Sequence, residues 1–134
     1  MRTMKISKAL VAAAAGLVCV CLPARAAETL VMKSGETINL STLWWIANCR
    51  SLLKGPMTVE ILDGPPEITA AIHEQDVIAH TSNCANPVKG GMLTLTVAKD
   101  IKEKIHAEVV LRVKYPTQDG DRQKSFDLDA VVVP

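Results

Sequence analysis

The sequence is poor in aromatic side chains, and it has no long apolar run after residue 26. Phe and Tyr occur once each and Trp twice, too few for a carbohydrate-binding face built from several stacked rings. A transmembrane helix needs about 20 consecutive apolar residues, and no segment after residue 26 approaches that length. Runs of basic residues are also missing, which argues against nucleic acid or an anionic membrane as the partner.

Recognisable catalytic motifs are missing as well. The chain contains no H-E-x-x-H, no G-x-S-x-G and no phosphate-binding glycine loop, the short motifs that carry zinc, acyl-transfer and nucleotide chemistry. His73, His80 and His106 are far apart in the sequence, and a catalytic or metal site would need at least two of them to converge with a carboxylate or a nucleophile. We therefore expect a protein that is not an enzyme and that uses no cofactor and no metal ion.

The beginning of the chain has the three parts of a secretory signal peptide. A basic start, an apolar stretch and an A-x-A cleavage site follow one another at 2–8, 9–22 and 24–26. The sequence thus predicts a signal peptide at 1–26 and a single domain at 27–134, which is a usual size for one core. Four of the 15 basic residues lie in the leader, so 11 remain against 14 acidic residues and the mature net charge is −3. Because the alanine-rich leader is typical of bacteria, we expect a periplasmic or secreted protein without a membrane span.

Two of the four cysteines leave with this leader, and Cys49 and Cys84 remain. An exported pair of cysteines is expected to form one disulfide. The alternative is a copper site that also uses His80 and Met92, but such sites require two histidines besides the cysteine and the methionine. No histidine lies between Cys84 and Met92, so the disulfide is the better interpretation.

Apolar and polar residues alternate with a period of two through most of the domain, which is typical of half-buried strands. The clearest example is 107–115. The other segments with this pattern are 29–33, 36–40, 57–61, 68–73, 77–80, 93–97 and 126–132. Turn residues such as Asp63-Gly64 and Gly90-Gly91 separate them. The pattern predicts an all-β antiparallel sandwich of about seven to nine strands.

Three segments need a separate interpretation. Residues 100–105 combine a possible N-cap aspartate with two isoleucines at i, i+4 spacing, so we expect one helical turn there. Residues 41–53 suit either a helix or a strand, and we favour a strand start followed by a loop at Cys49. The Asp119-Gly120 pair lies between the two clearest strands and predicts an antiparallel hairpin with its loop at 116–122.

The order of elements near the C-terminus resembles the last three strands of an immunoglobulin-like domain. Over residues 92–133 a strand, a helical turn, a long strand, an Asp-Gly hairpin and a terminal strand follow one another. The resemblance implies an immunoglobulin-like sandwich (Ig-like), an architecture that hosts many unrelated functions. The sequence departs from antibody-type domains because Trp44 and Trp45 precede Cys49 instead of lying between the two cysteines.

The Trp44-Trp45 pair is the most unusual local feature of the domain. On a strand, adjacent side chains point to opposite faces, so we expect one ring in the core and the other at the surface or under a loop. An exposed ring could serve as a stacking platform for a sugar or as a hot spot for a protein partner. The simpler alternative is that the fold covers both rings.

A small group of charged residues surrounds the expected hairpin. Arg112 and Lys114 share the outward face of their strand, and Arg122 follows the turn that holds Asp119 and Asp121. These five residues could bind an anionic ligand or a partner, or they could be a solvated face that discourages aggregation through sheet edges. The aspartates lack the spacing of an EF-hand loop, so we expect solvated carboxylates and not calcium ligands.

These observations favour an exported, non-enzymatic binding module that contacts an envelope or extracellular protein. One alternative is a carrier of a small ligand or a metal that uses Trp44, Trp45 or the histidines. The other is a small periplasmic hydrolase whose site is dispersed in the sequence, with His73, His80 or His106 meeting a carboxylate in the fold. The sequence leaves the ligand, the partner and the oligomeric state open.

Overall fold

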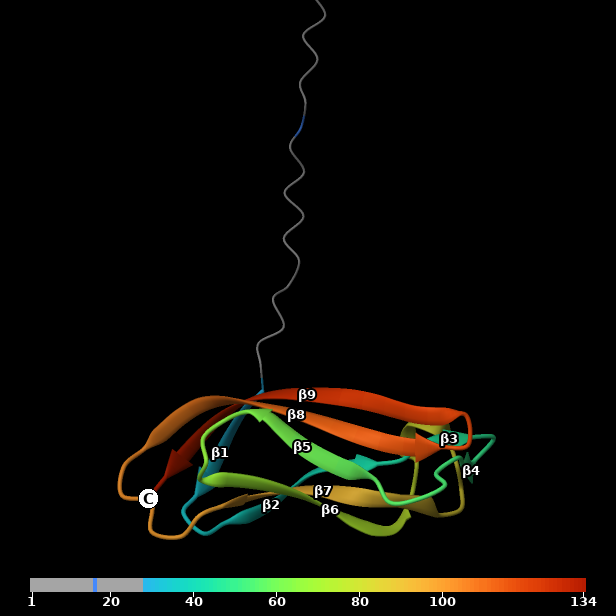
Figure 1. Cartoon of the computed structure of the whole chain (residues 1–134), viewed down its shortest axis with the longest axis horizontal. Helices are drawn as coiled ribbons and strands as arrows, with labels where there is room; N and C mark the ends of the chain where they lie inside the picture. Colours follow the sequence, from blue (N-terminus) through green and yellow to red (C-terminus); the bar gives the residue numbers. More distant parts are fainter. Residues whose placement is uncertain (1–15, 17–27) are drawn as a thin grey trace, which may run out of the picture.

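The computed structural model describes Gly16 and residues 28–134, so the predicted signal peptide and its cleavage site fall, apart from Gly16, outside the described residues. Two β-sheets pack face to face, and a small hairpin lies at one end (Figure 1). In the described part of the chain, no helix is long and apolar enough to cross a membrane. The prediction of an all-β sandwich is confirmed.

The larger sheet has four strands in the order β1-β9-β8-β5. β1 pairs in parallel with β9, and the other neighbours are antiparallel. The predicted hairpin is present, and its strands are longer than expected: the ladder runs to Thr117 opposite Gly120, which leaves a loop of only Gln118 and Asp119. The strands of this sheet are β1 (Thr29–Lys33), β5 (Thr58–Asp63), β8 (Ile105–Thr117) and β9 (Gly120–Val133).

The smaller sheet has three antiparallel strands in the order β2-β7-β6. β2 ends just before the tryptophan pair, and a two-stranded hairpin follows it. The turn of this hairpin consists of Asn48 and Cys49, both with positive φ (52° and 57°), as a tight hairpin turn requires. A strand followed by a turn at Cys49 is therefore the structure of this ambiguous segment. The elements are β2 (Thr37–Leu43), β3 (Ile46–Ala47), β4 (Arg50–Ser51), β6 (Ile68–Val77) and β7 (Val88–Val97).

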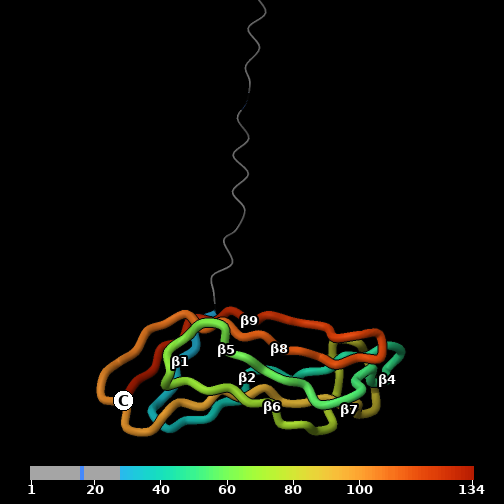
Figure 2. The backbone as a smooth tube through the Cα atoms, viewed as in Figure 1, coloured from blue at the N-terminus to red at the C-terminus, as the bar shows by residue number. Residues whose placement is uncertain are grey.

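Figure 2 shows the two sheets as two layers, and strands of both layers contribute the buried residues of the core. Strand alternation places every second side chain there, and the fully covered ones include Met32, Leu93, Leu95, Leu111 and Val113, each 0% exposed. Burial of one such side chain contributes roughly 1.5–3 kcal/mol. The alternation that identifies β8 and β9 in the sequence is thus the alternation between core and outer face.

The structure corrects the expectation for two glycines. Gly90 and Gly91, read as a turn, lie inside β7. A Cβ atom on Gly90 would stand 2.3 Å from the Leu43 carbonyl oxygen and 2.6 Å from Val77 Cγ2, which is too close for any side chain. These glycines allow β2, β7 and β6 to approach one another, and they do not end a strand.

Two further expectations are wrong. The separate strand at 77–80 does not exist as such, because β6 continues through Val77 and a short 3-10 helix, η1 (His80–Ser82), follows. The helical turn at 100–105 is not formed: Asp100 has a φ of +65°, whereas an N-cap residue has extended backbone. The Ile101 amide donates to Ser34 Oγ at 3.1 Å, so the segment is held as a loop against the β1–β2 turn.

Candidate functional site

A disulfide secures one end of the sandwich. Cys49, at the tip of the β3–β4 hairpin, is bonded to Cys84 in the loop after η1, with their Cα atoms 5.5 Å apart. The predicted pair is therefore at disulfide distance. The bridge holds the loop over the outer side of the smaller sheet, where it closes a second small core made of Val77, Ala79, Cys84 and Val88, with Trp44 and Ile46 against it.

The two tryptophans point to opposite sides at this end. Trp45 packs on the main core, its ring centroid 5.2 Å from that of Tyr115. Trp44 packs on the second core beneath the loop. Both rings are only half-buried. Their opposite directions are what strand alternation predicts for two adjacent residues. Burial also raises the pKa of the Tyr115 phenol above 10.0.

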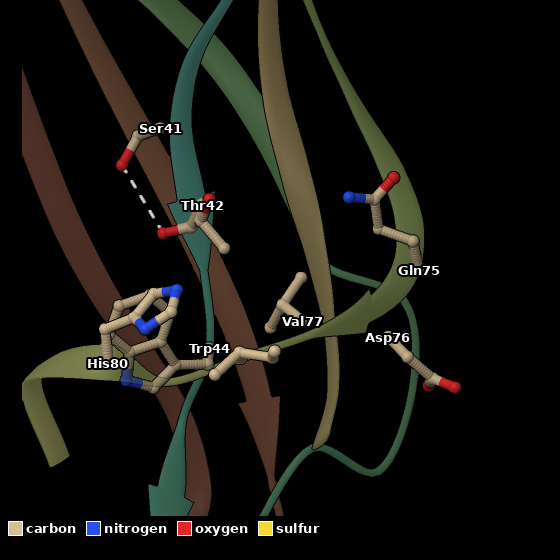
Figure 3. Close-up of a pocket in the computed structure, with 8 residues that line it drawn as sticks. Ser41, Thr42, Trp44, Gln75, Asp76, Val77 and His80 are labelled. Atoms are coloured by element: carbon tan, nitrogen blue, oxygen red, sulfur yellow. Dashed lines mark hydrogen bonds between the residues drawn. The ribbon is translucent and has the colours of Figure 1, made fainter. Parts of the chain in front are cut away.

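A first hollow, which we call the Trp44 hollow, opens beside Trp44 on the outer side of the smaller sheet and has a volume of about 440 Å³. Figure 3 shows Trp44 and His80 together on one side, with Gln75 and Asp76 across from them. The end of β2, the end of β6 and η1 supply the lining. Its residues are Ser41, Thr42, Trp44, Gln75, Asp76, Val77, Ile78 and His80.

A second hollow, the Trp45 hollow, of about 350 Å³, lies next to the same segment of β2. It is lined by the rims of both sheets and by buried Leu43 and Tyr115, each 2% exposed. Lys124 of β9 contributes the only charge of this lining. The full set is Ser41, Thr42, Leu43, Trp44, Trp45, Thr81, Tyr115 and Lys124. The two hollows share Ser41, Thr42 and Trp44, so the end of β2 forms the wall between them.

Of the five charged residues predicted around the hairpin, Arg122 lies on a different face of the sheet from Arg112, Lys114 and Asp121. Residues that pair directly across antiparallel strands point to the same face. Lys114 opposes Gln123 on the outer face, whereas Arg122 opposes the buried Tyr115 and therefore points to the inner side. Arg112 is on the outer face with Lys114, and its Nη2 lies 3.6 Å from Glu60 Oε1, so part of the positive charge is neutralised.

The two aspartates of the predicted surface are placed by the same ladder. Asp119 is in the two-residue turn, and Asp121 pairs with Pro116 on the outer face. Both are exposed. Of the seven residues of the predicted binding surface, only Trp44 and Trp45 line the two hollows.

The three histidines lie on different elements. His73 is on β6 opposite Met92, His80 is in η1 beside Trp44, and His106 Nε2 is 2.8 Å from Asp129 Oδ1 on the larger sheet. Among residues 28–134, no group of three or more His, Cys, Asp or Glu is placed to hold a metal ion. His80 is the histidine that borders the Trp44 hollow, with Asp76 in the same lining.

Sequence reasoning did not find Thr42, Gln75 and Asp76 as lining residues. Their proximity depends on the registers of β2 and β6 against β7, and no local motif encodes a register. Comparison with known protein families, with curated proteins and with solved structures found no match to this chain.

Proposed function

We propose that this chain is an exported, non-enzymatic binding module of the bacterial cell envelope, and that its partner is an envelope or extracellular protein. The observation that carries the proposal is the half-buried Trp44 standing between two open hollows on a β scaffold. Tryptophan is enriched among residues that dominate binding energy, especially when it borders pockets that a partner can fill and desolvate. Loops on a rigid sandwich are also common places for recognition.

Export is supported by the cysteine pair. Disulfides persist in oxidising compartments and are rare in the cytosol, and Cys49 and Cys84 are at bonding distance. Together with the signal peptide that the first 26 residues predict, this favours the periplasm or the extracellular space.

We also infer that the sandwich is Ig-like. We number the long strands in chain order and leave out the short hairpin strands β3 and β4. The larger sheet then contains the first, third, sixth and seventh strands, and the smaller sheet contains the second, fourth and fifth. This is the Greek-key distribution of a constant-type immunoglobulin domain, except that the first strand pairs with the last instead of the second.

The lining of the Trp44 hollow favours a second candidate, a carrier of a small polar ligand. Gln75 and His80 border the same space as the Trp44 ring, and Asp76 lies at its margin with its carboxylate pointing away. Small-molecule sites combine an apolar wall with a few polar groups in this way. In this case the free ligand, and not a protein, would occupy about 440 Å³ beside Trp44.

The test is capture from envelope extract with the exported protein, purified from the periplasm of an expression host and immobilised. Trp44→Ala and Gln75→Arg are the site variants; Gln75 is exposed, so its change fills the hollow without disturbing a core. Leu62→Ala, at a 44% exposed residue of β5, is the matched control. We expect one specific protein whose recovery falls at least about tenfold for both site variants and stays unchanged for the control.

Repeated absence of any specific partner would contradict the proposal. Equal recovery by Gln75→Arg and the original protein would place the contact elsewhere. Binding of a small extract metabolite that Gln75→Arg abolishes, with no protein captured, would support the carrier instead.

A further inference from the structure

Half of the last strand has an uncovered edge. β1 pairs with β9 only from Asp129 to Val133, at one end of the sheet (Figure 1). Residues 120–128 pair with β8 on one side, and in the part of the chain that the structure describes no strand pairs with them on the other. An open edge of nine residues is a template for strand addition, which proteins use for recognition and otherwise protect against.

The groups on this edge can be identified from one hydrogen bond. The Asp129 amide donates to the Glu28 carbonyl oxygen at 3.3 Å, so it points away from β8. Successive amides of a strand alternate in direction, so every second residue before Asp129 shares its orientation. The residues whose N–H and C=O groups face the open edge are therefore Asp121, Gln123, Ser125 and Asp127.

The inner side of the same half-strand is positively charged. Arg122 and Lys124 oppose Tyr115 and Val113 in the ladder, so they point to the inner side of the sheet, yet both are exposed. Lys124 Nζ lies 5.2 Å from the centroid of the Phe126 ring, and the same lysine borders the Trp45 hollow. An added strand would thus place its inward side chains beside two cations, an aromatic ring and the Trp45 hollow.

In two antiparallel registers a second copy of the chain is a poor occupant of this edge. Antiparallel self-pairing centred on Gln123 would set Arg122 against Lys124 of the other copy, and pairing centred on Lys124 would set the two lysines against each other. Like charges directly opposite destabilise a strand pair. Cleavage after Ala26, as proposed, would leave only Ala27 and Glu28 before β1, too few residues to pair along 120–128.

We infer that the open half of β9 receives an extended segment of the partner protein as a fifth strand of the larger sheet. The segment would carry acidic side chains inward, toward Arg122 and Lys124, and apolar side chains on its opposite face, because successive side chains of a strand alternate. This inference rests on the proposed binding function and states how the partner is held. Main-chain hydrogen bonds would supply affinity, and the two cations would select the sequence.

Proline substitution tests the mode directly. The Ser125 amide faces the open edge, so Ser125→Pro removes a donor needed by an added strand and leaves the β8 ladder bonded, as prolines on edge strands do. Ser125→Ala is the matched control. The probe is a capped nine-residue peptide in which Val and Glu alternate. The same peptide with Lys in place of Glu is the charge control. Amide hydrogen exchange of the exported protein is measured with and without each peptide.

In the free protein we expect the Gln123 and Ser125 amides to exchange at least about a hundredfold faster than the Lys124 amide, because only the latter is bonded within the sheet. The Val and Glu peptide should slow the amides at positions 123 and 125 at least about tenfold, both in the original protein and in Ser125→Ala, because alanine keeps the backbone N–H. It should bind Ser125→Pro at least about tenfold more weakly, and the lysine peptide should not bind.

Equal protection of Gln123, Lys124 and Ser125 in the free protein would show that the edge is already covered and would overturn the inference. So would peptide binding that Ser125→Pro leaves intact. If Ser125→Pro captures the envelope partner normally while Gln75→Arg does not, strand addition is refuted and the binding function stands. If the original protein captures no partner, the binding function itself fails.

Discussion

Loss of the Cys49–Cys84 bond should destabilise the domain by an amount that can be worked out from the chain. The bond closes a loop of 35 residue steps, and the chain-entropy relation gives about 3.8 kcal/mol at 25 °C for a loop of that length. For a domain of this size, such a loss lowers the melting temperature by roughly 15–25 °C. The free energy of unfolding is measured by urea titration of the oxidised protein and of the same protein reduced and alkylated after unfolding.

The effect should also be local. The bond holds the loop that packs on Trp44, whereas Trp45 contacts Tyr115 in the main core. In a Trp45→Phe background, reduction under native conditions should shift the Trp44 emission to longer wavelength before the sheets unfold, since the second core would open first. The double variant Cys49→Ala, Cys84→Ala is the genetic counterpart of reduction. It should lose slightly more unfolding free energy than the reduced protein does, because the Cys84 side chain is only 5% exposed and its truncation removes packing.

A urea midpoint that is the same for the reduced and the oxidised protein would refute this reasoning. Two thiols that titrate in the protein purified from the periplasm of an expression host, before any reductant is added, would refute it as well.

Two further predictions concern the scaffold. Gly90→Ala should destabilise the domain by more than about 2 kcal/mol, because its Cβ would overlap the Leu43 carbonyl oxygen. Gly55→Ala is the matched control, since its Cβ would meet its nearest neighbour at 3.8 Å. Equal urea midpoints for the two variants would contradict the packing described for β2 and β7. Burial raises the pKa of Tyr115, so its stabilisation is complete below the unfolded pKa of 10.0 and is lost as the pH rises through the folded pKa; Tyr115→Phe should flatten the fall in unfolding free energy above pH 10, and an unchanged slope would show that other groups cause it.

The fold could be predicted from the sequence where one face of a strand is core and the other is solvent. β8 shows this because Val109, Leu111 and Val113 are fully buried between neighbours that are exposed or half-buried. The prediction of a turn at Gly90 and Gly91 was wrong because a pair of glycines indicates a turn and a close approach of strands equally well. Only the positions of Leu43 and Val77 in the fold distinguish a close approach from a turn.

The candidate site could be predicted less completely. The opposite faces of Trp44 and Trp45 follow from strand alternation. The face of Arg122 does not follow without the length of the hairpin loop: a loop at 116–122 leaves the register open, whereas the observed loop of two residues fixes Arg122 opposite Tyr115. The Trp44 and Trp45 hollows need tertiary contacts between β2, β6, η1 and β9, which no segment contains by itself.

Hydrogen exchange of the protein bound to its captured partner is the most direct test of the binding account. The account predicts slowed exchange at 41–45 and 75–80, around the two hollows, together with Gln123 and Ser125 on the open edge of β9. Protection confined to 106–114 on the outer face of the larger sheet, or no protection anywhere, would contradict it.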